Sequence, residues 1–107
     1  MNLIKEITDE KELKKELKGT GVKILFFRTG WCEACSLQSK MLCELANECS
    51  FRIKVLKIDV DENEKIAKGY GVKVLPTTIT VINGEIVSRL EGLTSKGDIA
   101  EILIKLM

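Results

Sequence analysis

The chain has 107 residues, enough for one hydrophobic core but not for two, so we expect a single domain over residues 1–107. Its formal net charge of +1 argues against nucleic acid or a membrane surface as the main partner. No apolar run approaches the roughly 18 residues that a membrane helix needs. The first residues show neither a long apolar stretch nor a small-residue cleavage site, so no secretory signal is visible and we expect a cytoplasmic protein.

The first elements predicted are a short strand and a helix. Residues 3–7 alternate apolar and polar side chains, a pattern typical of a strand with one buried face. Asp9 and Glu12 have the spacing of a capping box, which predicts that a helix begins there and ends before Gly19.

A buried strand and the longest helix come next. Residues 22–28 form a mainly apolar run of strand type. The segment from about 33 to 48 has helical spacing and predicts a helix with one apolar stripe. The members of that stripe are Leu37, Met41, Leu45 and Cys49, with Leu42 and Ala46 beside them.

A further strand and a short helix follow. Residues 53–60 are mainly apolar and predict a second buried strand. Asp61 and Glu64 are expected to cap a short helix that ends near Lys68, before two glycines.

The last third of the chain predicts a hairpin and a final helix. Residues 77–82 and 85–90 have strand character and are joined by Asn83-Gly84, the strongest short hairpin signal. Ser95 is expected to cap the last helix. Its core face is predicted to consist of Ile99, Ile102, Leu103 and Leu106.

The predicted order β-α-β-α-β-α-β-β-α indicates an α/β fold, a central mixed sheet of about five strands flanked by four helices. Ligands of such sheets tend to bind beyond the carboxyl ends of the strands. The chain crosses that edge directly after residue 28, so the residues that follow are the first place to look for a site.

Cys32 and Cys35 stand at that point, at the start of the longest helix. The first turn of a helix has unpaired N–H groups and the positive end of the dipole, which stabilise a thiolate. Along a continuous helix, Cys35 and Cys43 would be roughly 12 Å apart and Cys43 and Cys49 about 9 Å, whereas a disulfide needs Cα atoms within about 7 Å. We therefore expect only Cys32 and Cys35 to pair, in a redox site and not a zinc site.

The other two cysteines are expected to differ in exposure. Cys43 falls roughly 160° from Leu45 around the helix, at about 100° per residue, so it should be exposed, either as an idle thiol or as an intermolecular or regulatory one. Cys49 lies on the apolar stripe and is most simply a small core residue.

The motif Trp31-Cys32-Glu33-Ala34-Cys35 is followed by further segments in a fixed order. They are the stretch K-I-D-V-D-E-N at 57–63, Y-G-V-K-V-L-P-T at 70–77, N-G-E at 83–85 and E-G at 91–92. Together these segments resemble the thioredoxin family over nearly the whole chain. The resemblance implies a thioredoxin fold and a protein dithiol–disulfide oxidoreductase with no metal and no organic cofactor, only the redox-active Cys32–Cys35 disulfide. It also implies protein disulfide substrates, recycling by a disulfide reductase, and a monomer.

The resemblance also assigns roles to individual residues. Cys32 is expected to be the exposed nucleophile that attacks a substrate disulfide, and Cys35 the more buried thiol that resolves the mixed disulfide. Trp31 is expected to shield the disulfide and to line the substrate surface.

A second segment is expected to complete that surface. The resemblance implies that the Leu75–Pro76 peptide bond is cis and lies beside the cysteines. The backbone of Leu75 would then pair with an extended substrate, and Gly92 would belong to the same substrate-binding surface.

The chain departs from the family at two places. Phe26 stands where the family has a buried aspartate, so Lys57 lacks that partner, and resolution by Cys35 must use water, Lys57 or another group. Glu33 and Ala34 replace the usual Gly-Pro between the cysteines. The Glu33 carboxylate complements the helix dipole but disfavours a neighbouring thiolate, and we expect the dipole to prevail.

Two other functions stay open at this point. A glutaredoxin-like, glutathione-dependent reductase would generally begin near the strand before the motif, whereas here a strand–helix unit precedes it. A non-enzymatic thioredoxin-fold module could bind a partner through the surface between Trp31 and Pro76. Assays of glutathione turnover and of insulin reduction separate these functions from the first.

Overall fold

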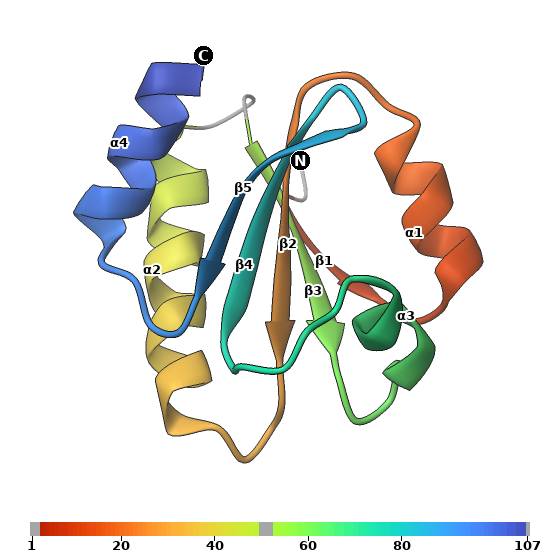
Figure 1. Cartoon of the computed structure of the whole chain (residues 1–107). Coiled ribbons are helices and arrows are strands. Elements are labelled where there is room, and N and C mark those ends of the chain that lie inside the picture. Colours follow the sequence, from red (N-terminus) through yellow and green to blue (C-terminus); the bar gives the residue numbers. More distant parts are fainter. Residues whose placement is uncertain (1–2, 50–52, 107) are drawn as a thin grey trace.

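The computed structural model describes residues 3–49 and 53–106. Within these residues the elements are β1 (Ile4–Ile7), α1 (Glu10–Leu17), β2 (Val22–Arg28), α2 (Glu33–Cys49), β3 (Ile53–Asp59), α3 (Glu64–Gly69), β4 (Thr77–Ile82), β5 (Glu85–Glu91) and α4 (Lys96–Leu106). The strands form one mixed sheet in the order β1-β3-β2-β4-β5. Helices α2 and α4 cover one face of the sheet, while α1 and α3 cover the other (Figure 1). The predicted element order and fold class are therefore confirmed.

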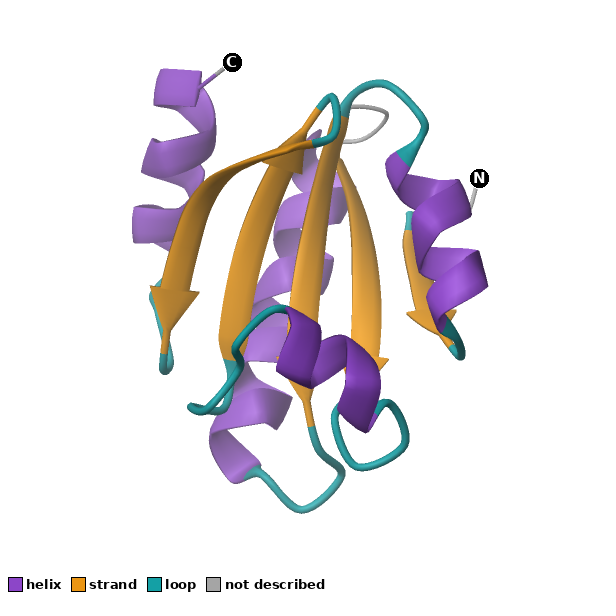
Figure 2. Ribbon diagram, turned by 45° about the vertical axis from the view of Figure 1, so that its right-hand side comes forward, coloured by secondary structure: helices purple, strands orange, loops and turns teal. Residues whose placement is uncertain are grey.

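Three neighbouring strands of the sheet, β1, β3 and β2, pair in parallel and end at the same edge. β3 pairs in parallel with both β1 and β2, while β4 runs antiparallel to β2 and forms a hairpin with β5. Figure 2 shows the arrowheads of the parallel strands pointing to one edge, with the loops that lead into α2 and α3 beyond it. This is the edge at which the cysteine motif was predicted to lie.

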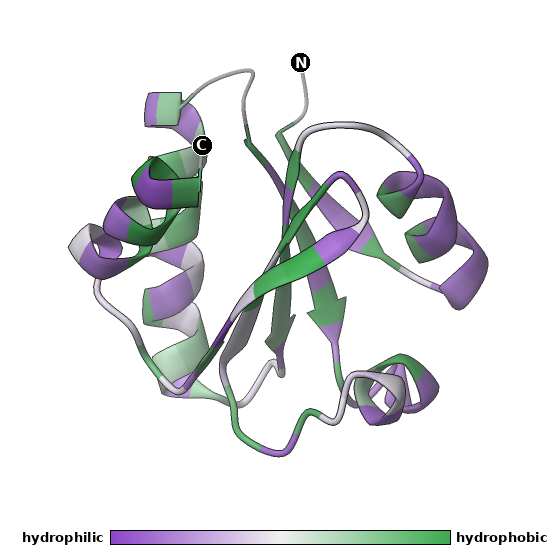
Figure 3. Ribbon diagram, turned by 45° about the horizontal axis from the view of Figure 1, so that its top comes forward, coloured by the Kyte–Doolittle hydropathy of each residue, from purple (hydrophilic) through white to green (hydrophobic). Residues whose placement is uncertain are grey.

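The core is divided between the two faces of the sheet because strand side chains alternate. On β2, Val22, Ile24 and Phe26 pack on the α2 and α4 side. Leu25 and Phe27 point to the opposite side and pack with residues of α1 and α3. Figure 3 shows the result: the strands are mainly apolar in colour, and polar colours gather on the helices.

The buried face of α2 differs from the predicted stripe. Its buried residues are Cys35, Gln38, Leu42, Leu45 and Ala46. The prediction was wrong for Leu37, whose side chain is 50% exposed. Relative to the prediction, the helix is rotated about its axis so that Cys35 faces the sheet. Steps of three or four residues from Cys35 then lead to Gln38, Leu42 and the other buried positions.

The caps of two helices follow the prediction. The Asp9 carboxylate accepts a hydrogen bond from the Glu12 backbone N–H at 2.7 Å, and the Ser95 hydroxyl accepts one from the Asp98 N–H at 3.1 Å. The reciprocal bond of the first cap runs from the Thr8 backbone N–H to the Glu12 carboxylate, one residue earlier than in a regular capping box.

The start of α3 and the end of α4 differ from the prediction. Asp61 does not cap α3, because the helix begins at Glu64 and Asn63 holds the N-cap position; the Asp61 carboxylate instead accepts a hydrogen bond from Trp31. In α4, Ile99 and Leu103 are buried as predicted. Leu106 lies in the last turn, outside both core clusters, and is 41% exposed. No helix of the described residues is both long and apolar enough to cross a membrane.

The hairpin turn is fixed to a neighbouring loop. Asn83 and Gly84 both have positive φ, 50° and 87°, as a tight two-residue turn between strands requires. The Asn83 side-chain oxygen accepts a hydrogen bond from the Gly21 N–H at 2.9 Å, and the Asn83 N–H donates to the Gly21 carbonyl at 3.1 Å. The turn thus holds the start of β2, the strand that leads to the cysteine motif.

Candidate active site

The cysteine motif lies where β2 ends and α2 begins. The loop that joins them forms the lowest part of the molecule in Figure 1. The Cys35 backbone N–H donates a hydrogen bond to the Cys32 sulfur at 3.2 Å. A free N–H group at the N-terminus of a helix is thereby directed at the sulfur, and this arrangement stabilises a Cys32 thiolate. All four cysteines are described, and none of them is in a disulfide.

The two cysteines differ in burial. Cys32 is half-buried, whereas Cys35 is 1% exposed and belongs to the core cluster beneath α2. Burial, with a hydrogen bond to the Cys32 side chain, raises the pKa of Cys35 to about 11. A hydrogen bond from the Thr29 backbone and the charge of Arg28 act in the opposite direction on that pKa. At neutral pH Cys35 is therefore a thiol, which must lose its proton before it can attack.

Trp31 is exposed, with 73% of its surface accessible. Its indole Nε1–H donates to the Asp61 carboxylate at 2.9 Å. Asp61 belongs to the turn after β3, in which the Asp59 carboxylate accepts hydrogen bonds from the backbone N–H groups of Asp61 and Glu62. The indole is thus held from a neighbouring loop, while its rings stay open to solvent.

The segment before β4 also matches the expectation. The Leu75–Pro76 peptide bond is cis. The Gly92 N–H donates to the Pro76 carbonyl at 2.8 Å, so the segments around Pro76 and Gly92 lie side by side. Exposed apolar side chains, Val74 and Leu93, stand next to these residues in the chain. The geometry therefore joins two of the residues that were predicted to form one surface.

Gln38 is a residue of this region that the sequence reasoning missed. It is fully buried, and its side-chain amide oxygen accepts from the Thr94 N–H at 2.8 Å while the amide nitrogen donates to the Thr94 carbonyl at 3.0 Å. These bonds fix the segment after Gly92 to the cysteine-bearing helix. The only signal in the sequence was a polar residue one helical turn after Cys35.

Phe26 and Lys57 lie on the same face of the sheet as Cys35. They are register partners on β2 and β3, and Phe26 is fully buried in the cluster that contains Cys35. The Lys57 side chain is half-buried and makes no hydrogen bond or ion pair with any described residue. It lines a pocket of about 330 Å³ together with Cys35 and four small residues, Thr29, Gly30, Ser36 and Ser39.

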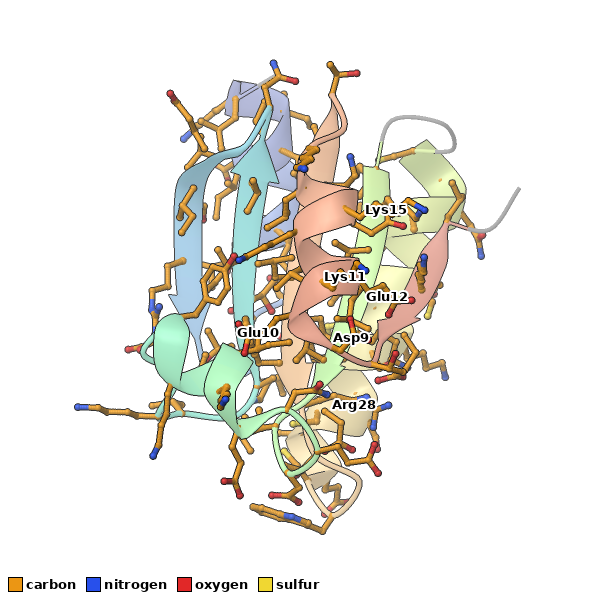
Figure 4. All side chains as sticks on the ribbon, turned by 90° about the vertical axis from the view of Figure 1, so that its right-hand side faces the viewer. Asp9, Glu10, Lys11, Glu12, Lys15 and Arg28 are labelled. Carbon is orange, nitrogen blue, oxygen red and sulfur yellow. The ribbon has the colours of Figure 1, made fainter. Side chains whose placement is uncertain are left out.

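Arg28 completes the wall of that pocket, and the sequence reasoning did not single it out. One terminal nitrogen of its guanidinium donates to the Glu6 carboxylate at 2.7 Å, and the other lies 3.7 Å from the Asp59 carboxylate. Its Nε is buried and has no hydrogen-bond partner among the described residues. Figure 4 shows Arg28 at the end of β2, above the loop that leads into α2.

The remaining residues of the motif region differ in exposure. Glu33 is exposed in the first turn of α2, and Ala34 is half-buried. The prediction that Cys43 is exposed was wrong: it is half-buried, because it borders the buried face of α2 beside Ala46. Cys49 is half-buried and packs against the core cluster. In the described part of the chain, no three His, Cys, Asp or Glu side chains converge in a way that could hold a metal ion.

Comparison with known proteins agrees with this geometry. The family model "Thioredoxin" matches residues 4–105. The thioredoxin of Staphylococcus epidermidis is 38% identical over 86 residues, covering 80% of this chain and 83% of that protein. The thioredoxin of Bacillus subtilis is 36% identical over 85 residues, covering 79% and 82%. A solved structure, that of a mutant thioredoxin from Halobacterium salinarum, superposes with a TM-score of 0.89 at 26% identity and covers 98% of this chain and 93% of that one. This chain therefore has the thioredoxin fold and belongs to the thioredoxin family of thiol–disulfide oxidoreductases.

Proposed function

We propose that this chain reduces disulfides of protein substrates, with Cys32 as the nucleophile and Cys35 as the resolving thiol. The observation that supports this most is the hydrogen bond from the Cys35 N–H to the Cys32 sulfur at 3.2 Å. It directs the N-terminus of α2 at the more accessible of the two thiols, and the thiolate is the form that attacks a disulfide.

The proposed reaction has two steps. The Cys32 thiolate attacks one sulfur of the substrate disulfide, a mixed disulfide forms, and the other substrate sulfur leaves as a thiolate that takes up a proton. Cys35 then loses its proton and attacks the Cys32 sulfur, which releases the second substrate thiolate. The chain is left with a Cys32–Cys35 disulfide, and a disulfide reductase must supply two electrons for the next cycle.

The substrate is proposed to bind beside the cysteines as an extended segment. Leu75 would pair with the substrate through its backbone, while Trp31 and Gly92 would flank it. This assignment is supported by the exposed indole and by the contact between Gly92 and Pro76. A reductive function also needs a steady supply of electrons, so we propose that the chain works in a reducing compartment such as the cytoplasm. We further propose that it works as a monomer.

Insulin reduction tests the proposal. The wild-type chain with dithiothreitol should accelerate the reduction of insulin, and Cys32→Ser and Cys35→Ser should abolish that acceleration. Cys43→Ser is the matched control, since it removes a cysteine of the same helix outside the motif, and should keep wild-type activity. A wild-type chain that binds insulin without accelerating its reduction would instead be a binding module.

The glutaredoxin-like alternative has less support. The β1–α1 unit that precedes the motif is part of the fold, since β1 pairs with β3 over four register positions from Ile4 to Ile7. The same purified chain should therefore show little turnover with glutathione and a small disulfide. Turnover faster with glutathione than with dithiothreitol would reverse this assignment.

A further inference from the structure

The resolving thiol needs help that the family resemblance does not supply in this chain. Cys35 is buried, and its thiolate must form for the mixed disulfide to be resolved. Phe26 fills the position at which the resemblance implies a carboxylate. Among the described residues that line the pocket beside Cys35, none carries a carboxylate. The charged groups on that wall are two cations, Arg28 and Lys57.

Arg28 is held in place, whereas Lys57 is not. On β2, Arg28 follows Phe26 at the i+2 position and so projects to the α2 side of the sheet. Its guanidinium is fixed between Glu6 at 2.7 Å and Asp59 at 3.7 Å. The Lys57 side chain has no hydrogen bond or ion pair with a described residue that would fix its ammonium group. A fixed cation stabilises a nearby anion more effectively than a mobile one, because no ordering is needed as the charge forms.

We propose that the guanidinium of Arg28 stabilises the Cys35 thiolate as it forms during resolution, while water in the pocket takes up the proton. This inference rests on the proposed function, since it concerns the second step of the same reaction. Arginine stays protonated, so it cannot act as the base; its part is electrostatic.

Protons and electrons balance in this step. Water in the pocket accepts the Cys35 proton and passes it to bulk solvent. The Cys35 thiolate attacks the Cys32 sulfur, the Cys35–Cys32 bond forms, and the bond between Cys32 and the substrate sulfur breaks. The substrate sulfur leaves as a thiolate and takes a proton from solvent. Over the two steps of the reaction, the cysteine pair is oxidised by two electrons, and the substrate is reduced by the same two.

The charges that face Cys35 come from several elements. Cys32, in the loop just before α2, raises the pKa of Cys35, and Arg28 on β2 lowers it. On β3, Lys57 adds a positive charge and Asp59 a negative one, while Glu6 on β1 binds Arg28 directly. The two carboxylates temper the effect of Arg28 and at the same time fix its position.

Single-turnover reaction with the aromatic disulfide dithiobis(nitrobenzoate) tests the proposal. In a background with Cys43→Ala and Cys49→Ala, the first thionitrobenzoate is released by Cys32 and the second by Cys35. The rate of the second release, measured against pH, follows the formation of the Cys35 thiolate. Arg28→Gln should move this profile to higher pH and slow the second release at neutral pH by about three- to tenfold, as the loss of a nearby opposite charge does. The first release should be unchanged.

Three further variants decide the result. Arg28→Lys keeps the charge and should stay close to the wild-type profile. Lys57→Gln removes the other charge of the wall and should shift the profile less than Arg28→Gln. Glu6→Gln removes the negative charge that tempers Arg28 but keeps a side-chain oxygen that can accept the guanidinium hydrogen bond and hold it in place. It should therefore move the profile to lower pH, a readout that remains if Arg28→Gln does not fold.

The proposal is wrong if Arg28→Gln leaves the second release unchanged, if Arg28→Lys slows it as much as Arg28→Gln, or if Lys57→Gln has the larger effect. An unchanged or upward-shifted profile in Glu6→Gln would also overturn it. Failure of the proposed function looks different, since a wild-type chain that released only one thionitrobenzoate would lack a resolving thiol altogether.

Discussion

The Trp31 indole donates a hydrogen bond to the Asp61 carboxylate at 2.9 Å and thereby links the loop before α2 to the turn after β3. Thirty residues separate the two in the chain, but the parallel strands β2 and β3 end at the same edge and bring them together. A side chain that is otherwise open to solvent thus has one defined anchor.

Loss of that anchor should affect large substrates more than small ones. In Asp61→Ala, an indole without its partner must be ordered when a protein binds, so KM for insulin should rise about fivefold, equivalent to a hydrogen bond of about 1 kcal/mol. The rate with a small aromatic disulfide should stay the same. Asp61→Asn, which keeps an acceptor oxygen, is the control. Equal losses for both substrates would mean that the bond supports the cysteines and not the substrate surface.

Cys32 should be alkylated first when the reduced chain meets limiting iodoacetamide at neutral pH. The Cys35 N–H and the helix N-terminus stabilise its thiolate, which is the form that reacts. Peptide mapping after partial modification measures the order. Faster modification of Cys43, the half-buried thiol further along α2, would count against the assignment of Cys32 as nucleophile.

Cys35→Ser should trap substrates on Cys32. The attacking thiol and the N–H that stabilises it remain, whereas the thiol that releases the product is gone. The variant should recover partners from cell extract as mixed disulfides that dithiothreitol releases. The double variant Cys32→Ser, Cys35→Ser cannot form this bond and should recover none. If both variants recovered the same partners, those partners would be bound without a disulfide, which would contradict the prediction.

The parts of this fold that were predictable are those carried by local patterns. β2 is recognisable because it is apolar over most of its length, and the Asn83-Gly84 turn because few other sequences adopt two successive positive φ angles. The cysteine motif combines a strand end with a helix start, so its place at the sheet edge follows from chain order. The rotation of α2 about its axis was not predictable. The predicted stripe through Leu37 and the observed buried face through Leu42 both contain enough apolar residues to pack on the sheet.

The contacts that complete the site depend on elements far apart in the sequence. Gln38 binds Thr94 across 56 positions, and Arg28 binds Glu6 across 22. No spacing in the sequence predicts either pair, because each contact depends on which strands and loops are neighbours in the fold. A buried glutamine on an apolar helix face and an arginine at the end of a buried strand are recognisable as unusual, but their partners appear only once the sheet order is known.

The ion pairs of Glu16 with Lys5 and Lys54 predict how the free energy of unfolding depends on pH. The hydrogen bond from Lys54 lowers the pKa of Glu16 most, burial opposes it, and the bond from Lys5 adds to the lowering. Because the pKa is lower in the folded state, the carboxylate stabilises the fold above its unfolded pKa of about 4.3. This contribution is lost as the pH falls through the folded pKa.

Denaturant unfolding at several pH values measures this effect. Glu16→Gln should be less stable than the wild type near pH 7, and the difference should shrink as the pH falls below about 4. Lys14→Gln, on the exposed side of α1, is the control and should show no such pH-dependent difference. A gap between wild type and Glu16→Gln that stays constant down to low pH would mean that packing, and not charge, is responsible.

Phe26→Asp restores the buried aspartate that the family resemblance implies at this position, and so tests what its absence does. The residue at this position faces Lys57 on β3 and Thr78 on β4, whose buried hydroxyl has no hydrogen-bond partner among the described residues. Loss of the ring should lower the free energy of unfolding by about 3–5 kcal/mol, as large-to-small changes in a core do. A carboxylate fixed behind Cys35 could accept its proton, so we expect faster resolution of a Cys32 mixed disulfide near neutral pH. Burial would raise the pKa of the new carboxyl, unless Lys57 pairs with it.

Phe26→Asn is the matched control for this experiment, because it creates nearly the same cavity without a charge. Resolution is measured as the second thionitrobenzoate release, and folding is checked by the unfolding midpoint of each variant. Faster release in Phe26→Asp than in Phe26→Asn would identify proton removal from Cys35 as the slow part of resolution in the native chain. Equal rates in two folded variants would mean that proton removal is not limiting. The absence of an aspartate at position 26 would then leave resolution by Cys35 unaffected.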